Sequence, residues 1–314
     1  MANAAYVSVL LPTHNRRAQV LRACQALARQ DYPHDSFEVL VVDNASTDDT
    51  AAHVQACAPH APIAIRYLYE AQTGKVHALN TGMAAAAGQV LAFLDDDCEP
   101  RPEWLRHLLG GFHEPGVGVV AGPAYSHFPQ EVEDDPERRF LARKFLGDFT
   151  LGETRRELRG WESPLGCNMA VLAEAARRVG GFSRAFGPKG NVKGAYEESD
   201  FAWRIARAGY RLWYEPQAAV DHYPDAARLT RAGLRGLAVL TGHDAYLAKH
   251  PEPAGPVTRA LRALGVGLEI LLKALRWILS PTSRARFVAE FRLRCAVGKL
   301  AAAWKGPPKT TDRP

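Results

Sequence analysis

Hydrophobic and polar positions in roughly the first 125 residues alternate between two periods. Short, nearly continuous apolar runs are separated by longer stretches with the 3.6-residue periodicity of amphipathic helices. Strands are expected at 6–12, 37–43, 63–69, 89–94 and 117–121, and helices at 17–29, after a cap at 46–49, and at 75–87. Apolar strands alternating with helices predict an α/β fold with a mostly parallel sheet covered on both faces.

The pattern becomes less regular after this point. Residues 131–160 are charged, with one helix expected around 138–145, and glycines punctuate 166–182. A helix with acids in its first turn is expected from about 196, followed by short strands at 211–215 and 218–222. We therefore predict one α/β domain over 1–224, in two halves of about 1–125 and 126–224, and a helical C-terminal region over 225–314.

Polar residues follow three of the expected strands. The stretches are Thr13–Asn15, Asp43–Asn44 and Asp95–Asp97. In open parallel sheets, ligands bind at the carboxyl ends of the strands. Three adjacent carboxylates repel one another, and a hard divalent cation held by oxygen ligands would relieve that repulsion. Such a cation commonly binds substrate phosphates, so we expect a reaction with a diphosphate leaving group.

Composition and other motifs narrow the classes. The first strand is followed by neither a Gly-x-Gly-x-x-Gly nor a P-loop motif, which disfavours dinucleotide and P-loop sites. The five cysteines are scattered without a Cys-x-x-Cys pair, so we expect no disulfide framework or structural zinc site, and a reducing cytoplasm. We recognise neither a signal-peptide pattern nor an apolar run long enough to span a membrane.

Several motifs occur in a characteristic order. They are THNR, VVDNASTDDT, GKVHALNTGMAAAAGQVLAFLDDDCEP, GCNMA, GGF, EESDFAWRIARAGY and DHY. Together they resemble family 2 glycosyltransferases of the GT-A fold, over about 6–223. The resemblance implies an inverting, metal-dependent transfer of a sugar from a nucleotide-diphosphate sugar, a UDP-sugar in the first instance, to a hydroxyl acceptor in cell-surface polysaccharide or glycolipid assembly. The Gln-x-x-Arg-Trp motif of processive members is missing from the sequence, so we expect one sugar per encounter.

The resemblance also implies residue roles. The first half would bind the nucleotide and the second the acceptor. Mn²⁺ or Mg²⁺ would be held by Asp95, Asp97 and His222. The nucleotide-sugar would contact Pro12, Thr13, Asn15, Asp43, Lys75, Asn80, Asp95 and Asp96. The sugar and acceptor pocket would contain Trp161, Gly166, Asn168 and Met169. The base would come from Glu197, Glu198 and Asp200.

The identity of the base is open. Glu198 stands at the usual base position, where the family usually has Asp, so the choice lies between Glu198 and Asp200. Asp200 could instead pair with Arg204 one turn later, and the acids at 95–97 could simply cap a helix. Two rival functions are a degenerate nucleotide-sugar binder and a sugar nucleotidyltransferase. The second would require a Gly-rich basic loop that THNRR does not supply.

The C-terminal region differs in charge and pattern. From residue 225 it carries 16 Lys and Arg against 6 Asp and Glu, whereas the preceding residues carry 23 against 28. One helical stripe is predicted at Leu261, Leu264, Leu268, Leu271, Leu275 and Ile278, with basic residues on another side at Arg259, Arg262, Lys273 and Arg276. A second basic segment covers 284–305. This pattern favours contact with an anionic membrane, at the cytoplasmic face of the inner membrane, and suits a saccharide or lipid-linked acceptor. A cap on the domain and a dimer interface are the alternatives. Nucleic-acid binding is disfavoured, because the basic excess lies on an amphipathic helix rather than among stacking aromatics.

Overall fold

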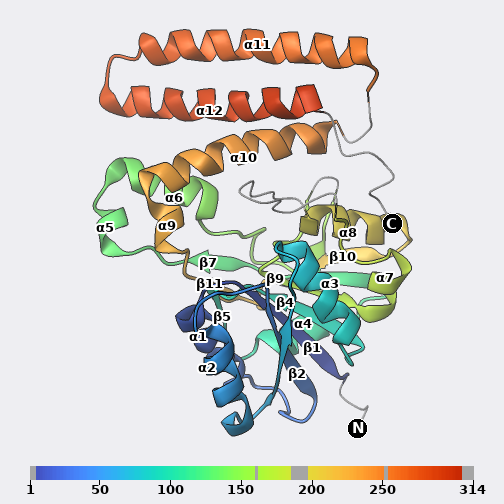
Figure 1. Cartoon of the computed structure of the whole chain (residues 1–314). Helices are drawn as coiled ribbons and strands as arrows, with labels where there is room; N and C mark the ends of the chain where they lie inside the picture. The colour runs from blue at the N-terminus through green and yellow to red at the C-terminus, as the bar shows by residue number, and fades with distance from the viewer. Residues whose placement is uncertain (1–4, 160–161, 185–196, 251–253, 306–314) are drawn as a thin grey trace.

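A computed structural model describes residues 5–159, 162–184, 197–250 and 254–305. Its centre is an eight-stranded sheet in the order β3-β2-β1-β4-β9-β6-β10-β8 (Figure 1). The strands are β1 (Val7–Thr13), β2 (Phe37–Asp43), β3 (Ala64–Tyr69), β4 (Val90–Leu94), β6 (Val117–Ala121), β8 (Arg156–Glu157), β9 (Asn168–Leu172) and β10 (Arg211–Tyr214). The predicted α/β fold with a mostly parallel sheet is confirmed, and the strands expected at 6–12, 37–43, 63–69, 89–94, 117–121 and 211–215 all form within a residue or so.

The sheet contains one central strand that the sequence pattern did not indicate. Strand β9 lies between β4 and β6 and runs antiparallel to both. Its residues were expected to be a pocket loop after Gly166. The strand is only five residues long and its residues are nearly all buried, so it has no polar–apolar alternation to reveal it.

Alternate residues of each central strand pack on opposite faces of the sheet. Val7, Val9 and Leu11 of β1 belong to one core cluster, whereas Leu10 belongs to another. The first face is covered by α1 (Arg17–Leu27), α2 (Thr50–Cys57) and α4 (Trp104–Gly111), and the second by α3 (Lys75–Ala85), α7 (Ala173–Arg178) and α8 (Glu197–Arg207). This two-sided burial explains why the strands read as continuous apolar runs.

A small second sheet brings distant residues together. It has the order β5-β11-β7, formed by β5 (Cys98–Pro100), β11 (Val220–His222) and β7 (Ala124–Ser126). Strand β11 is antiparallel to β5 and parallel to β7, so His222 is in register with Cys98 on one side and with Ser126 on the other. Strand β5 starts directly after the Asp95–Asp97 turn. The pairing therefore carries His222 to the acidic cluster, more than a hundred residues away in sequence.

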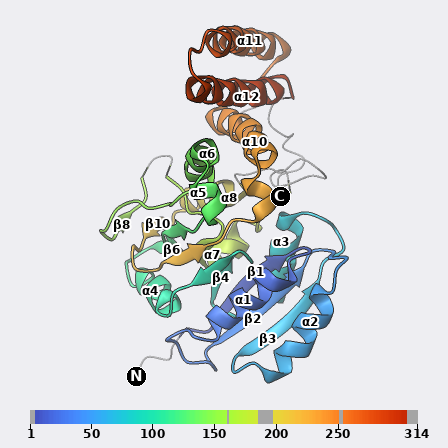
Figure 2. The ribbon, with the colours of Figure 1, turned by 90° about the vertical axis from the view of Figure 1, so that its left-hand side faces the viewer.

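The short helix η1 (Ala58–His60) follows α2 and packs against α2 and β3. The remaining helices form layers on one side of the sheet. They are α5 (Gln130–Glu133), α6 (Pro136–Leu146), α9 (Ala226–Leu229), α10 (Arg231–Lys249), α11 (Pro256–Ile278) and α12 (Ser283–Lys305). Helix α10 packs on α6, α12 packs on α10, and α11 lies outermost on α12 (Figures 1 and 2). A core of Leu141, Leu234, Phe287 and their neighbours joins α6, α10 and α12. None of the described helices combines the length and apolar character needed to cross a bilayer.

Candidate active site

A pocket of about 860 Å³ opens where the carboxyl ends of β1 and β4 meet the start of α8 and one side of α10. Its lining comes from every part of the fold. The first half contributes Pro12, Thr13, His14, Arg16, Asn44, Thr73, Gly74, Lys75, Asp95–Asp97 and Ala124. The second half contributes 143–149, Leu165, Gly166, Cys167, Glu197, Glu198 and His222, and the C-terminal region adds Arg228, Leu237, Leu240 and Thr241.

One side of the pocket is organised by a partly buried lysine, Lys75, whose side chain is 21% exposed. The Nζ atom of Lys75 lies 2.7 Å from Oδ1 of Asp95 and 3.1 Å from Oε1 of Glu198. Burial alone would lower the pKa of Lys75, but the negative charges of Asp95 and Glu198 outweigh it and raise that pKa well above its ordinary value. Lys75 is therefore a fixed cation that joins the end of β4 to the start of α8.

Glu197 and Glu198 are adjacent but have different environments. Glu197 is 4% exposed, and within the described part of the chain its Oε2 atom is buried without a hydrogen-bond partner. Burial and the neighbouring charge of Glu198 raise the pKa of Glu197 to about 8. Glu198 instead presents its carboxylate to Lys75 and to the backbone of Gly166. A Cβ atom built on Gly166 would lie 1.8 Å from Oε1 of Glu198, so only glycine leaves space for this carboxylate.

The other side of the pocket holds two buried aspartates and two arginines. Arg16 donates to Oδ1 of Asp96 at 2.8 Å, and Thr13 donates to Oδ2 of Asp96 at 2.8 Å. Burial nevertheless raises the pKa of Asp96 to about 6, against the opposing charge of Arg16. Asp97 has Arg16 at 3.4 Å and Arg228 at 3.7 Å. These guanidinium groups are part of the compensation that the acidic triplet needs.

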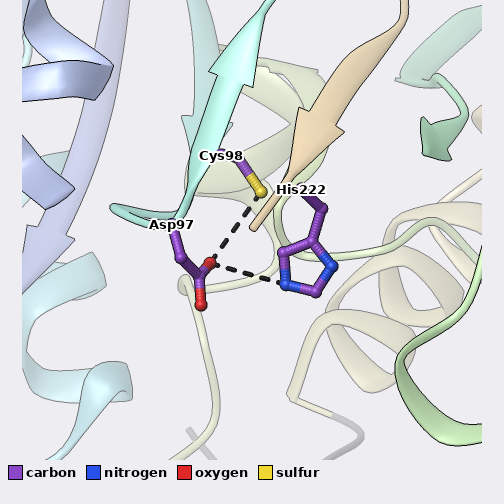
Figure 3. A group of neighbouring side chains, drawn as sticks. All are labelled: Asp97, Cys98 and His222. Atoms are coloured by element: carbon purple, nitrogen blue, oxygen red, sulfur yellow. Dashed lines mark hydrogen bonds and ion pairs between the residues drawn. The ribbon is translucent and has the colours of Figure 1, made fainter. Parts of the chain in front are cut away.

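Asp97 also faces His222 and Cys98, which Figure 3 draws together. Nε2 of His222 lies 3.7 Å from Oδ1 of Asp97, and Sγ of Cys98 lies 3.9 Å from the same atom. Burial would raise the pKa of Asp97, but His222, Arg16 and Arg228 together lower it to about 2. The three side chains offer ligand atoms that all lie within 4.8 Å of one another. Asp95, which was expected to share the metal, is not in this group and pairs with Lys75.

The chemistry of these donors fits a hard or borderline divalent ion. The nitrogen and sulfur neighbours of Asp97 lie 3.4–3.9 Å from its carboxylate. Charge-assisted hydrogen bonds are typically about 2.7–2.9 Å long. A carboxylate held at this spacing retains acceptor capacity for a cation. Carboxylate oxygen is a ligand that suits Mn²⁺ and Mg²⁺, whereas imidazole better suits borderline ions such as Zn²⁺ and Fe²⁺. Cys98 fits less well, because its complete burial raises the pKa of the thiol well above its ordinary value and keeps it protonated.

Several residues expected at the site lie elsewhere. Asp200 does not line the pocket; it accepts a hydrogen bond of 2.7 Å from Arg204, which is anchored to the carbonyls of Val179 and Gly181. Asn80 exchanges both amide hydrogen bonds with the backbone of Phe182. Asp200 therefore orients Arg204, which ties α8 to Val179 and Gly181, and Asn80 ties α3 to the nearby Phe182. Neither side chain lines the pocket.

Of the residues expected in the acceptor pocket, some line the pocket and others are buried in the sheet. Gly166 lines the pocket, but Asn168 and Met169 are 0% and 1% exposed on β9. Asn168 accepts a hydrogen bond from the indole of Trp104 and donates to two backbone carbonyls, each at 2.7 Å. The expectation that these two side chains form pocket wall is thus corrected by their position in the central sheet. Trp161 lies outside the described residues.

Asp43 and Asn15, which were expected to contact the nucleotide, do not line the pocket but hold the loops beside it. Asp43 is 1% exposed and accepts hydrogen bonds from the amide of Ser46 and the hydroxyl of Tyr67. Asn15 has a φ of 53° and accepts from the amides of Thr47 and Asp48. Together they tie the loops after β1 and β2. The adjacent residue Asn44 lines the pocket, and its amide is held by the backbone of Glu70, Gln72 and Gly74.

Residues 8–180 match the model of the family described as Glycosyl transferase family 2. The chain belongs to glycosyl transferase family 2. This confirms the resemblance carried by the motifs. A pre-mycofactocin glycosyltransferase of Mycobacterium tuberculosis is 29% identical over 96% of this chain and 61% of its own length. The chain thus spans about three-fifths of that relative.

Solved structures share the fold at low identity. The mannosyltransferase PcManGT from Pyrobaculum calidifontis, in complex with GDP-Man and Mn²⁺, superposes with a TM-score of 0.61 at 21% identity, covering 95% of this chain and 88% of that one. TarS 1-349 of S. aureus, in complex with UDP, gives a TM-score of 0.53 at 17% identity, covering 96% and 90%. These similarities confirm the predicted GT-A fold.

Proposed function

We propose that this protein is an inverting, metal-dependent glycosyltransferase that moves one sugar from a nucleotide-diphosphate sugar to an acceptor hydroxyl. The observation that carries the proposal is the meeting of three charged groups in one pocket. These are the Asp97–His222 pair, the guanidinium groups of Arg16 and Arg228, and the carboxylate of Glu198. They suit a cation, a diphosphate and a base respectively.

We assign the base role to Glu198. Its carboxylate lines the pocket and is kept in place by Lys75 and Gly166, whereas Asp200 is held by Arg204. In the proposed reaction, Glu198 accepts the proton of the acceptor hydroxyl as its oxygen attacks the anomeric carbon. The bond from that carbon to the diphosphate oxygen breaks, and the single displacement inverts the anomeric configuration. Glu197 stays protonated near neutral pH, which avoids a second buried negative charge beside the base.

The diphosphate side of the pocket is assigned to the residues around Asp97. Asp97 and His222 would hold Mn²⁺ or Mg²⁺, which when bound supplies positive charge to stabilise the departing diphosphate. Arg16 and Arg228, already within 3.7 Å of Asp97, are positioned to bind phosphate oxygens. Pro12, Thr13 and Asn44 lie on the adjacent wall and are assigned to the nucleoside.

The identity of the sugar donor and the cellular process are proposed from the similar solved structures and from the free cysteines. We propose a UDP-sugar as the first donor to test and GDP-mannose as the second, because the structurally similar TarS and PcManGT were solved with UDP and with GDP-Man. The five cysteines are all free thiols, which suits a reducing cytoplasm. The proposed setting is the assembly of a cell-surface polysaccharide or glycolipid.

The donor site is tested by calorimetric titration of UDP, GDP, dTDP and CDP, with Mn²⁺ and again with EDTA. One nucleotide is expected to bind in a metal-dependent way, and Asp97→Asn should weaken that binding at least tenfold. The matched control is Asp35→Asn, at an exposed residue outside the pocket, which should bind as the wild type does. Failure of every nucleotide to bind the folded protein would contradict the proposal.

The base is tested by comparing Glu198→Gln with Asp200→Asn. We expect Glu198→Gln to lower kcat by at least a hundredfold while donor binding is retained, since general-base catalysis typically contributes about 10²–10⁴-fold. Asp200→Asn should lower the melting temperature more than it lowers kcat. The reverse ranking of the two kcat values would transfer the base role to Asp200.

A further inference from the structure

Helix α11 exposes a long apolar face on the outside of the molecule. Figures 1 and 2 show it as the outermost layer, with α12 between it and α10. Nine apolar side chains of α11 and its C-cap are each 52–74% exposed: Val257, Leu261, Leu264, Leu268, Leu271, Leu272, Leu275, Ile278 and Leu279. At ~100° per residue these positions fall within an arc of about 120°. The predicted leucine stripe therefore exists, but it faces outward.

The packing of α11 on α12 does not use this stripe. The buried residues of α11 are Ala263 and Val266, which lie on the opposite side of the helix and contact the α12 residues Ala302 and Ala303. Monomeric soluble proteins rarely expose contiguous apolar patches of this extent, and such patches commonly mark an interaction site. The leucine stripe therefore makes no contribution to the packing between the described helices.

The charges beside the stripe are basic. A cavity of about 630 Å³ lies at the turn between α11 and α12, lined by Lys273, Arg276 and Arg292 together with the stripe residue Leu279. Each of these two helices has a single acidic residue. Glu269 is paired with Lys273 and Lys299, and Glu290 is paired with Arg235 and Arg294. Among the described residues, the exposed guanidinium groups of Arg276 and Arg292 have no acidic partner, so they place positive charge next to the apolar face.

We propose that α11 docks this protein on the surface of a membrane containing anionic phospholipids. The helix lies in the plane of the interface, its leucine stripe enters the boundary between headgroups and acyl chains, and the basic cavity at the α11–α12 turn binds lipid phosphate. A second copy of the chain is a poorer occupant, because it would bring the same positive charge to the shared face. A spanning orientation is not available to the described helices.

Docking in this way would place the pocket close to the membrane. Helix α10 lines the pocket through Leu237, Leu240 and Thr241, and α12 separates α10 from α11. Two helix-to-helix spacings of about 8–10 Å each put the axis of α10 roughly 20 Å from the axis of the docked helix. That distance suits an acceptor sugar carried on a membrane lipid. The lipid-linked acceptor rests on the proposed transferase function, whereas the docking does not.

The test is co-sedimentation of the full chain with phosphatidylcholine vesicles, with and without about 30% phosphatidylglycerol. We expect binding to the anionic vesicles that falls at least tenfold in 0.5 M NaCl, and weak binding to the neutral ones. The variant Leu264→Gln/Leu268→Gln/Leu275→Gln should lose at least tenfold in vesicle partitioning, with unchanged melting temperature and nucleotide binding. Tyr69→Gln is the matched control, because Tyr69 is 59% exposed on β3, away from α11, and its loss should leave partitioning unchanged.

A second variant separates the charge from the apolar contact. Arg276→Gln/Arg292→Gln should retain the fold and lose the preference for anionic over neutral vesicles. Sedimentation velocity without lipid measures whether the protein forms a dimer through the leucine stripe instead. A wild-type dimer that the leucine variant dissociates, together with no vesicle binding, would assign the stripe to a second copy and overturn membrane docking. Nucleotide binding measured on the same samples distinguishes this failure from failure of the transferase proposal.

Discussion

The close approach of the Glu198 side chain to the backbone of Gly166 gives a direct test of the proposed base. In Gly166→Ala, the added Cβ would lie 1.8 Å from Oε1 of Glu198 and 2.3 Å from its Cδ and Cγ atoms. An ordinary contact starts at 3.4 Å, so the carboxylate must move by roughly 1.6 Å. The obstructing group is the end of a flexible side chain, so the fold should tolerate the change.

A displacement of this size should act mainly on catalysis. Misplacing a reacting group by about 1 Å can cost on the order of 10²-fold in rate, equivalent to about 2.7 kcal/mol of transition-state stabilisation. We therefore expect kcat to fall about a hundredfold, with the donor Kd and the melting temperature nearly unchanged. The assay is the initial rate of nucleoside diphosphate release at saturating donor and acceptor. Gly110→Ala is the matched control, because nothing lies within 4 Å of its added Cβ.

Glu198→Asp tests whether the rate loss in Gly166→Ala comes from displacement of the Glu198 carboxylate. Shortening the base by one methylene in Glu198→Asp should create space for the new methyl group. The rate penalty of Gly166→Ala should then be much smaller in the Glu198→Asp background than in the wild type, and the double-mutant cycle should show strong coupling. If folded Gly166→Ala retains kcat within threefold of the wild type, the carboxylate of Glu198 is not the positioned base.

Three other perturbations address the charges and the support of the site. Lys75→Met removes the cation that contacts the carboxylates of Asp95 and Glu198, so kcat should fall at least tenfold. Lys249→Met, at an exposed position, should leave kcat unchanged, and an unchanged kcat in Lys75→Met would rule out this positioning role for the lysine. Glu197→Gln should become more stabilising relative to the wild type as pH rises. The pKa of Glu197 is about 8 when folded against an ordinary 4.5, so its contribution to stability is complete below pH 4.5 and is lost as pH rises through 8, and thermal melts at pH 5 and pH 9 check the sign. Asn168→Ala removes three buried hydrogen bonds and should cost about 3 kcal/mol of unfolding free energy in denaturant titrations, whereas a pure loss of acceptor affinity at full stability would restore it to the pocket wall.

The sequence was most informative where local pattern and burial agree. The apolar runs at 37–43 and 89–94 became β2 and β4 because a strand covered on both faces needs apolar side chains in both directions. It was least informative at β9. The resemblance of the GCNMA motif to the family placed Asn168 in the acceptor pocket, yet its amide satisfies groups buried inside the sheet. Local sequence does not reveal which buried groups need a partner.

In the site, too, some features could be recognised from local sequence and others could not. The carboxylates at 95–97 and 197–198 were recognisable, because clusters of acids at a strand end and in a first helical turn are local features. Their pairing with cations was not, although Lys75 itself was expected at the site. Arg16 and Arg228 are separated by more than two hundred positions, and Lys75 joins Asp95 to Glu198 across a gap of more than a hundred residues. Charge compensation operates over distances of a few ångströms in space, which sequence spacing does not encode.

By itself, the sequence determined the α/β class, the family motifs, the acidic cluster and the leucine stripe of α11, since each depends on neighbouring residues or a short repeat. The tertiary structure alone decided that Glu198 faces the pocket while Asp200 faces Arg204, and that His222 meets Asp97 through the register of β11 with β5. It also decided that the leucine stripe points outward. A helical period fixes which side chains share a face, but only the packing of α11 on α12 through small residues decides which face remains exposed.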